Sequence, residues 1–250
     1  MSNSPLVTII TPCYNSESTL SKTVESVLCQ SYANIEYIII DDCSKDSSYN
    51  IALGYLDDPR VKVLRNAVNS KVAETRNRGL QLANGKYICF LDSDDWWSPM
   101  KLKAQVEFME DNNLCLSYMD YYRVFDNSQM RLVRCPDKAD IVDMLCGNVI
   151  ANLTAMVRRD DIASLRFLNI GHEDYMYWLS VMRSREIVAR RVPTDDGLSY
   201  YKVAAGSLSS NKIKAMSWQW NIYRFGLNLP FLHSLYFFSR YLISAFLKRL

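Results

Sequence analysis

Three carboxylates lie within four residues in the run Asp92, Ser93, Asp94 and Asp95. Negative charges spaced this closely repel one another unless a cation neutralises them. Mg²⁺ and Mn²⁺ prefer oxygen ligands, and Mg²⁺ is typically held by one or two carboxylates together with substrate phosphates. We therefore expect this run to hold Mn²⁺ or Mg²⁺. The structural alternative is a solvated loop that caps the next helix, since Asp and Ser are good N-cap residues.

Two more polar groups follow strand-like runs earlier in the chain. Pro12, Tyr14 and Asn15 follow the first run, and Asp41 and Asp42 follow the second. In a substrate site, the acids would accept hydrogen bonds from a nucleobase or a ribose. The alternative is an ordinary turn, because Asp, Ser and Asn are common turn residues.

An arginine and a second acidic pair complete the candidate set. Arg76 can pair with a diphosphate through two parallel hydrogen bonds, although a solvated helical arginine is the plainer alternative. Glu173 and Asp174 follow His172 at the expected start of a helix. A carboxylate there can act as a general base toward a hydroxyl group, or can simply match the positive end of the helix dipole.

The elements that must position these residues alternate through the first 110 residues. Apolar strand-like runs occupy 6–11, 35–40, 61–64 and 86–91, and helical patterns occupy 17–30, 72–83 and 101–112. Pro12 is expected to end the first strand. This order predicts an α/β fold with a mostly parallel sheet and helices on both faces. Ligands of such sheets bind beyond the carboxyl ends of the strands, where the polar groups above fall.

The second half of the chain has a weaker pattern. Strand-like runs are expected within 114–134 and at 188–192 and 198–203, and a helix at 173–183. The chain has 250 residues and neither an internal repeat nor a low-complexity linker. We expect one domain over 1–210, with a nucleotide-binding half at 1–112 and an acceptor-binding half at 113–210, followed by a helical tail at 211–250.

Composition limits the class of protein and its surroundings. Hydrophobic residues make up 49% and charged residues 22% of the chain, which is typical of a globular protein and argues against long disorder. The seven cysteines include no C-x-x-C pair, and their odd number does not suggest a disulfide framework. The first residues lack the features of a signal peptide. These features favour a cytoplasmic protein.

The tail differs from the rest of the chain in charge. From Gly197 onward there is no acidic residue, but there are seven basic ones. A helix from Pro230 would place His233, Arg240, Ser244 and Lys248 on one side, and Leu232, Leu235, Phe238, Leu242 and Phe246 largely on the other. We expect an in-plane helix on the inner face of the cell membrane, with packing against the domain as the alternative. The basic residues are interspersed with apolar ones, which argues against a nucleic-acid partner.

Four motifs, in this order, resemble family 2 of the inverting glycosyltransferases, whose fold is usually called GT-A. They are VTIITPCYNSESTL at 7–20, IEYIIIDDCSKD at 35–46, ETRNRGLQLANGKYICFLDSDDWW at 74–97 and HEDYMYWL at 172–179. The resemblance is dense over 6–109 and returns around Glu173. It extends to bacterial surface-polysaccharide enzymes.

The resemblance implies a role for each motif. Pro12, Tyr14, Asn15, Asp41 and Asp42 would border the donor nucleotide, Arg76 the diphosphate, and Asp92, Ser93 and Asp94 the ribose and metal. Asp174 would be the catalytic base.

Three loop residues depart from the pattern of the family. Cys43 and Lys71 stand in loops that often carry glycine, and Thr75 replaces a common alanine. The sequence also lacks the Gln-x-x-Arg-Trp motif of processive members, which favours the addition of a single sugar.

The sequence therefore predicts transfer of one hexose-type sugar, with a UDP-sugar as the expected donor. The expected acceptor is a saccharide carried on a polyprenyl diphosphate, in surface-polysaccharide synthesis. Two alternatives remain open at this stage. One is a nucleotidyltransferase, although Pro12 and its neighbours replace the Gly-rich loop usual there. The other is a non-catalytic nucleotide-sugar-binding or scaffolding protein.

Overall fold

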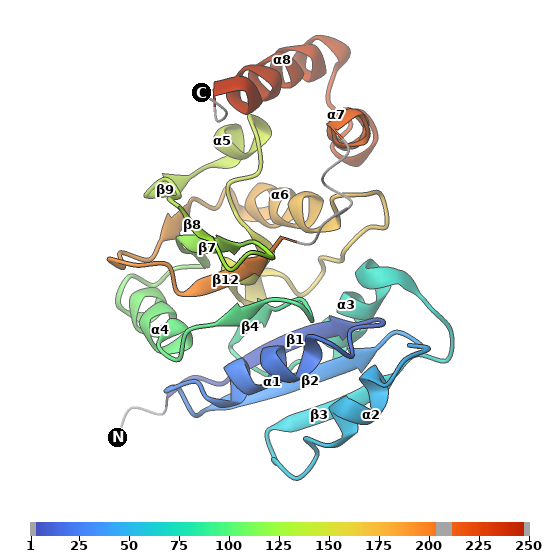
Figure 1. The fold of residues 1–250 in the computed structure, drawn as a ribbon. Coiled ribbons are helices and arrows are strands. Elements are labelled where there is room, and N and C mark those ends of the chain that lie inside the picture. The colour runs from blue at the N-terminus through green and yellow to red at the C-terminus, as the bar shows by residue number, and fades with distance from the viewer. Residues whose placement is uncertain (1–3, 204–211, 248–250) are drawn as a thin grey trace.

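The N-terminal part of the chain forms the expected alternation of strands and helices (Figure 1). The computed structural model describes residues 4–203 and 212–247. The first nine elements are β1 (Val7–Cys13), α1 (Leu20–Leu28), β2 (Ile35–Asp41), α2 (Ser48–Leu53), β3 (Val61–Arg65), α3 (Lys71–Leu82), β4 (Tyr87–Phe90), β5 (Trp96–Trp97) and α4 (Lys101–Asp111). Strands β3, β2, β1 and β4 are neighbours in that order and run parallel, so their carboxyl ends share one edge.

The first strand is longer than expected from the sequence. It does not end at Pro12, because Pro12 and Cys13 pair with Ile40 and Asp41 of β2. The ladder between β1 and β4 ends at Ile10, so Pro12 has a strand neighbour on one side only. A proline, which has no backbone N–H to donate, is therefore accommodated there.

The remaining elements extend this sheet and add a smaller one. They are β6 (Leu116–Tyr118), β7 (Tyr121–Val124), β8 (Met130–Val133), β9 (Lys138–Ala139), α5 (Ile141–Leu145), β10 (Met156–Arg158), α6 (Glu173–Arg185), β11 (Ala189–Arg191) and β12 (Ser199–Lys202). The large sheet has the order β3-β2-β1-β4-β10-β6-β11-β9, in which β10 is antiparallel to both of its neighbours. The small sheet has the order β5-β12-β7-β8. The expected mostly parallel sheet is thus present.

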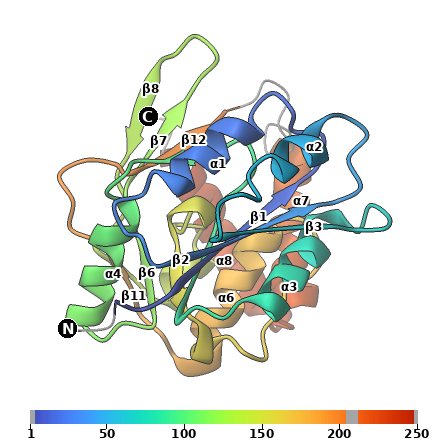
Figure 2. The ribbon, with the colours of Figure 1, turned by 90° about the horizontal axis from the view of Figure 1, so that it is seen from below.

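Both faces of the large sheet are buried. Adjacent residues of β1 point to opposite faces, so Ile9 and Ile10 belong to two separate apolar clusters. Figure 2 shows α1 and α2 on one side of the strands, with α3 and α6 on the other. Helix α3 approaches β1 closely at Gly79, where an added Cβ would lie 2.5 Å from Ile10. This glycine holds the helix against the sheet and thereby fixes the position of Arg76, one turn earlier.

The C-terminal helices lie at the opposite end of the molecule from β3 (Figure 1). They are α7 (Lys212–Asn221), a π-helix (Ile222–Gly226) and α8 (Phe231–Leu247), which begins directly after Pro230 as expected. None of the helices within the described ranges is both long and apolar enough to cross a bilayer. The expected domain boundary at 210, together with Lys248 and the side chains of Ser244 and Phe246, lies outside the described residues.

Helix α8 is apolar on both sides, which differs from the simple division expected. Phe237 and Phe238 pack inward, and the ring of Phe238 lies 5.5 Å from that of Trp220. Phe238, which was expected on one apolar side with Leu232 and Leu235, therefore packs against Trp220 of α7, while those two leucines are exposed. Other apolar residues of α8 and of the π-helix before it are exposed: Phe225, Phe231, Leu232, Leu235, Tyr236, Leu242 and Ile243.

Candidate active site

A cavity of about 1780 Å³ opens at the carboxyl edge of the parallel strands. Ligand pockets commonly measure about 300–1,000 Å³, so this cavity has room for two substrates. The N-terminal half contributes one wall to it. The hairpin of β7 and β8, the end of β12 and the start of α6 contribute others.

All but one of the residues predicted for the site line this cavity. They are Pro12, Tyr14, Asn15, Asp42, Arg76, Asp92, Ser93, Asp94, Asp95, Glu173 and Asp174. Asp41 does not line it. Its fully buried side chain forms an ion pair with Arg65 at 3.0 Å and accepts a hydrogen bond from the backbone N–H of Ser44. Asp41 thus fixes the loop that follows β2.

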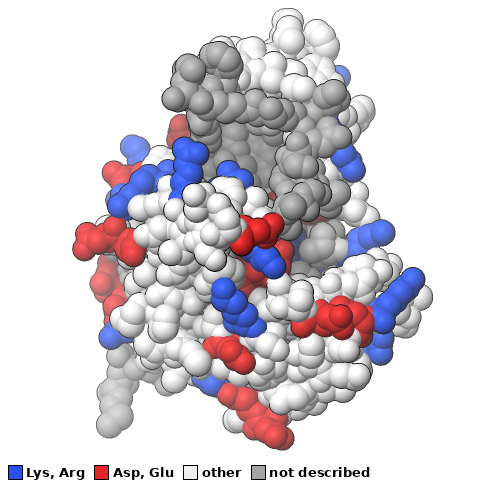
Figure 3. All heavy atoms as spheres, viewed as in Figure 1, with Lys and Arg blue, Asp and Glu red and all other residues white. Residues whose placement is uncertain are grey.

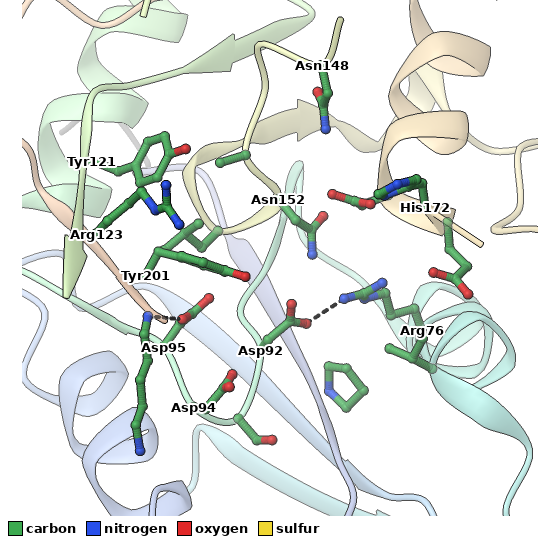
Figure 4. A pocket seen from close by; sticks show the side chains of 18 of the residues that line it. Arg76, Asp92, Asp94, Asp95, Tyr121, Arg123, Asn148, Asn152, His172 and Tyr201 are labelled. Carbon is green, nitrogen blue, oxygen red and sulfur yellow. Dashed lines mark hydrogen bonds and ion pairs between the residues drawn. The ribbon is translucent and has the colours of Figure 1, made fainter. Parts of the chain in front are cut away.

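Arg76 and Asp92 form an ion pair between α3 and the end of β4 (Figure 4). The guanidinium lies 2.5 Å from the carboxylate and is almost fully buried, whereas Asp92 is partly exposed. Burial lowers the pKa of Arg76, but the Asp92 carboxylate and the nearby Asp174 and Glu173 raise it further than burial lowers it. Arg76 therefore remains a permanent cation in the wall of the cavity.

Asp94 and Asp95 carry charge that Arg76 does not neutralise by direct contact. Burial raises the pKa of Asp94, and the negative charge of Asp92 raises it further. Burial and these neighbouring acids raise the pKa of Asp95 well above its usual value, although its carboxylate accepts a hydrogen bond from the backbone N–H of Lys202. A divalent cation would relieve this repulsion, so the donor set of Asp92 and Asp94 fits a hard metal completed by phosphate oxygens. Within the described residues, three or more potential ligand side chains do not gather around one point.

Asp42 lies at the base of the nucleotide side of the cavity. Its carboxylate accepts hydrogen bonds from the backbone N–H groups of Ser70 and Lys71, at 2.8 and 2.9 Å, and from the Asn66 amide at 2.7 Å. Asp42 thus holds the start of α3, in addition to facing the cavity. Thr75, which replaces a common alanine of the family, accepts a hydrogen bond from Asn66 and so joins this network.

Three non-glycine residues in the loops at this edge adopt left-handed backbone conformations. Asn15 has φ of 50°, Cys43 of 63° and Lys71 of 72°. Cys43 and Lys71 stand in loops where the family often has glycine, and they adopt the conformation that glycine adopts most easily. These loops therefore keep a glycine-like shape without glycine, and such strained residues are common at functional sites.

The start of α6 brings the second acidic pair to the cavity on the side of Arg76, whose pKa both acids raise. His172 precedes the helix in a left-handed conformation, and its ring lies edge-on to Trp218 of α7 at 4.9 Å. The preceding Gly171 has φ of 77°, and an added Cβ would lie 2.7 Å from the Trp218 ring. Tight packing of α7 thus fixes the turn that presents Glu173 and Asp174. No described side chain forms an ion pair or hydrogen bond with the carboxylate of Asp174, which leaves it available to a substrate hydroxyl.

The structure adds cavity residues that sequence reasoning missed. Asn152 is 6% exposed, and neither atom of its amide has a hydrogen-bond partner within the described residues. Arg123, Arg131 and Tyr201 come from the small sheet. The small sheet combines distant segments, so spacing along the chain gave no signal for these residues.

Comparisons with known proteins identify the family. A model of the family described as Glycosyl transferase family 2 matches residues 8–165. An uncharacterised glycosyltransferase of Haemophilus influenzae is 39% identical over 248 residues, which cover 98% of each chain. The Escherichia coli protein WfaP, described as a UDP-Glc:alpha-D-GlcNAc-diphosphoundecaprenol beta-1,3-glucosyltransferase, is 36% identical over 97% of this chain and 95% of its own.

Solved structures agree on the fold. S. aureus TarS in complex with UDP-GlcNAc has a TM-score of 0.71 at 20% identity, over 94% of this chain and 71% of that one. The mannosyltransferase PcManGT from Pyrobaculum calidifontis, in complex with GDP-Man and Mn²⁺, has a TM-score of 0.69 at 14% identity, over 95% and 70%. The fold is thus of the expected GT-A type. From the matched family model and from relatives that align over almost its whole length, this chain belongs to glycosyltransferase family 2.

Proposed function

We propose that this protein transfers a single hexose-type sugar from a UDP-sugar to a hydroxyl group of a lipid-linked saccharide, with inversion at the anomeric carbon. The observation that carries the proposal is the arrangement of one cavity. Arg76, Asp92 and Asp94 lie on its N-terminal side, and Asp174 enters it from α6. These residues come from segments far apart in the sequence, and together they supply a diphosphate site and a general base.

The chemistry follows from the charges of these groups. The Asp174 carboxylate takes the proton from the acceptor hydroxyl, and the oxygen forms a bond to the anomeric carbon. The bond from that carbon to the β-phosphate oxygen breaks, and UDP leaves with the negative charge. Arg76 faces that charge as a permanent cation. Attack opposite the leaving group inverts the configuration in one step.

Asp94 and Asp92 are the residues that would hold Mn²⁺ or Mg²⁺ beside the donor diphosphate. When bound, such an ion stabilises charge on the departing phosphate oxygen. The position of Asp94 beside Asp92 in the cavity supports this assignment, because burial and the Asp92 charge both raise the pKa of Asp94 and a cation would offset both effects. The Mn²⁺ complex of PcManGT is in keeping with it, but that chain shares only the fold.

The proposed acceptor and pathway rest on the relatives. WfaP and WfgD of Escherichia coli are described as acting on alpha-D-GlcNAc-diphosphoundecaprenol, and TuaG of Bacillus subtilis as a putative teichuronic acid biosynthesis glycosyltransferase. All three align with almost the whole of this chain at 34–36% identity. We infer that this chain also acts on a saccharide diphosphate lipid in surface-polysaccharide synthesis.

A lipid-linked acceptor requires that the enzyme reach a membrane surface, and the exposed apolar side chains of α8 are suited to bind one. Phe225 and Leu232 are 77% and 75% exposed, and further apolar side chains of α8 extend this surface. Residues 197–250 contain no acid, which suits an anionic lipid layer on the cytosolic side. In Figure 3 the acidic side chains lie over the body, and the described atoms of the α8 end are mostly uncharged.

The catalytic proposal is tested by nucleotide binding and turnover. We expect UDP with Mn²⁺ to raise the melting temperature of the wild type, and Asp94→Ala to abolish the metal-dependent part of that rise. Ligand at about 100 times its Kd adds roughly 2.7 kcal/mol of stability. GDP, CMP and dTDP serve as controls. Folded protein that binds none of these nucleotides would instead favour a scaffolding role.

The membrane proposal has its own test. The full chain should sediment with vesicles that contain phosphatidylglycerol, and Leu232→Ser with Ile243→Ser should reduce the bound fraction. Leu82→Ser, at an exposed position of α3, provides a matched control. Equal sedimentation of all three proteins would contradict the proposal.

A further inference from the structure

The hairpin of β7 and β8 carries two arginines that face each other across the strands. Arg123 and Arg131 are direct partners in the antiparallel register, and both line the cavity. Like charges placed directly opposite each other destabilise a sheet. Water and salt screen part of this cost, because Arg131 is exposed, and an anion bound between or above the two side chains would remove more of it.

Nothing among the described residues supplies that anion. Neither arginine forms an ion pair with an acid in 4–203 or 212–247. The contacts of Arg123 there are aromatic: its guanidinium lies 5.5 Å from the Phe125 ring and lowers the pKa that burial would otherwise give Tyr121 and Tyr201. Nearby arginines behave differently. Arg134 and Arg191 share Asp120, at 2.8 and 3.3 Å. The same region therefore neutralises two of its arginines and leaves two others facing the cavity.

Arg123 lies across the cavity from Arg76, which we propose to face the donor diphosphate, and on the same side as Asp94 and Asp95 (Figure 4). Figure 4 shows Arg123 and Tyr201 on one side of the cavity, with Arg76 and His172 on the other. Tyr201 lies beside Arg123 in the strand register, so its ring extends the same wall. A second phosphate group bound here would lie across the cavity from Asp174, which follows His172.

We propose that Arg123 and Arg131 bind the diphosphate of the acceptor, so that the acceptor sugar reaches across the cavity to Asp174. The inference rests on the proposed function and adds to it the residues that recognise the acceptor. An acceptor of this kind has one or more sugars, two phosphates and a hydrocarbon chain. Its diphosphate supplies the anion that the paired arginines lack, and arginine binds phosphate oxygens through two parallel hydrogen bonds.

Kinetics with two acceptors would test this site. One acceptor is GlcNAc diphosphate with a hexyl chain, and the other is the hexyl glycoside of GlcNAc without phosphate. With UDP-Glc as donor, Arg123→Gln and Arg131→Gln should each raise the KM of the diphosphate acceptor at least tenfold. The KM of UDP-Glc and the rate of transfer to the neutral glycoside should not change. Arg190→Gln, which removes an exposed strand arginine outside the cavity, should leave all values unchanged.

Direct binding distinguishes failure of this site from failure of the proposed function. Citronellyl diphosphate should bind the wild type in calorimetry, and citronellol should not. The double variant Arg123→Gln with Arg131→Gln should lose that binding, whether or not the wild type transfers sugar to these acceptors. Unchanged binding in the double variant, or an equal loss of UDP binding, would overturn the assignment.

Discussion

The two walls of the cavity differ in how their polar groups are satisfied. On the donor side, Asp42 and Asp92 already have partners within the protein: backbone N–H groups and Asn66 for the first, and Arg76 for the second. Asp94, the proposed metal ligand, is the exception on this side, because it forms no ion pair with a described residue. On the acceptor side, the Arg123–Arg131 pair and the Asn152 amide have no counter-charge or hydrogen-bond partner within the described residues.

This difference suggests that the two sides of the cavity respond differently to their substrates. Groups that are held by the protein itself keep their geometry before substrate arrives, which favours a donor site that is organised in advance. Groups without partners carry a cost in the free protein that a ligand removes on binding. On the acceptor wall, the bound acceptor would therefore supply the hydrogen-bond and charge partners that the free protein lacks.

The largest expected effect lies where the two walls meet. Asp174→Asn should reduce kcat by about 10²–10⁴-fold, because general-base catalysis contributes a factor of this size. UDP binding and the melting temperature should stay close to wild type, since no described residue forms an ion pair with Asp174. Steady-state rates and thermal shift with UDP would measure both. Glu173→Gln is the matched control, and an equal loss of turnover there would move the base to Glu173.

The second prediction concerns Asn152, the buried amide without a partner. Asn152→Leu should raise the stability of the free protein by roughly 1–2 kcal/mol, because an unsatisfied buried polar group is costly. The same change should lower kcat/KM by about 10- to 100-fold if the amide binds a sugar hydroxyl. Chemical unfolding and kinetics would test the pair of effects. A variant that is less stable and fully active would show that Asn152 has only a structural role.

The third prediction tests the donor half through its response to pH. Burial raises the pKa of Glu36, but hydrogen bonds from Lys62, Thr8 and Asn84 lower it to about 2. A carboxyl group with a depressed pKa stabilises the fold above its unfolded pKa of about 4.5, and this contribution is lost as the pH falls toward 2. Glu36→Gln should therefore cost about 2 kcal/mol at pH 7 and much less at pH 3.

Urea unfolding at both pH values would measure this difference. Glu107→Gln, at an exposed position of α4, controls for the loss of one charge. A cost for Glu36→Gln that stays constant with pH would contradict an ionised, hydrogen-bonded Glu36.

The two walls also differ in how well the sequence predicted them. The donor half could be predicted because its strands are continuous apolar runs and each cluster of acids follows one of them directly. Three of its parallel strands, β1, β2 and β4, bring Asn15, Asp42 and Asp92 to a single edge. Asp41 was placed in the same group, but the last pairing of β2 turns its side chain into the protein.

The acceptor wall could not be predicted in the same way. Tyr201 becomes a neighbour of Arg123 only because β12 pairs with β7, some 80 residues away in the sequence, while Arg123 meets Arg131 through the local β7–β8 hairpin. Short strands of four residues carry too little periodicity to reveal such pairing. The burial of Phe238 likewise depends on contact with Trp220, which no pattern within α8 encodes.

The smallest expected effect tests whether the donor side is held in shape at a cost. Cys43 has φ of 63°, which glycine adopts without the steric penalty of a Cβ. Cys43→Gly should stabilise the protein by about 0.5–1 kcal/mol, because relief of that strain exceeds the added freedom of the unfolded chain. Cys29→Gly, where φ is −85°, should be destabilising by a similar amount. Melting temperatures of the two variants would show whether each change stabilises or destabilises the protein.

If both variants lose stability, contacts of the Cys43 side chain, such as that of Sγ with the Ala67 carbonyl oxygen at 3.8 Å, outweigh the backbone strain. Side-chain contacts would then stabilise the loop after β2 by more than its left-handed backbone conformation destabilises it.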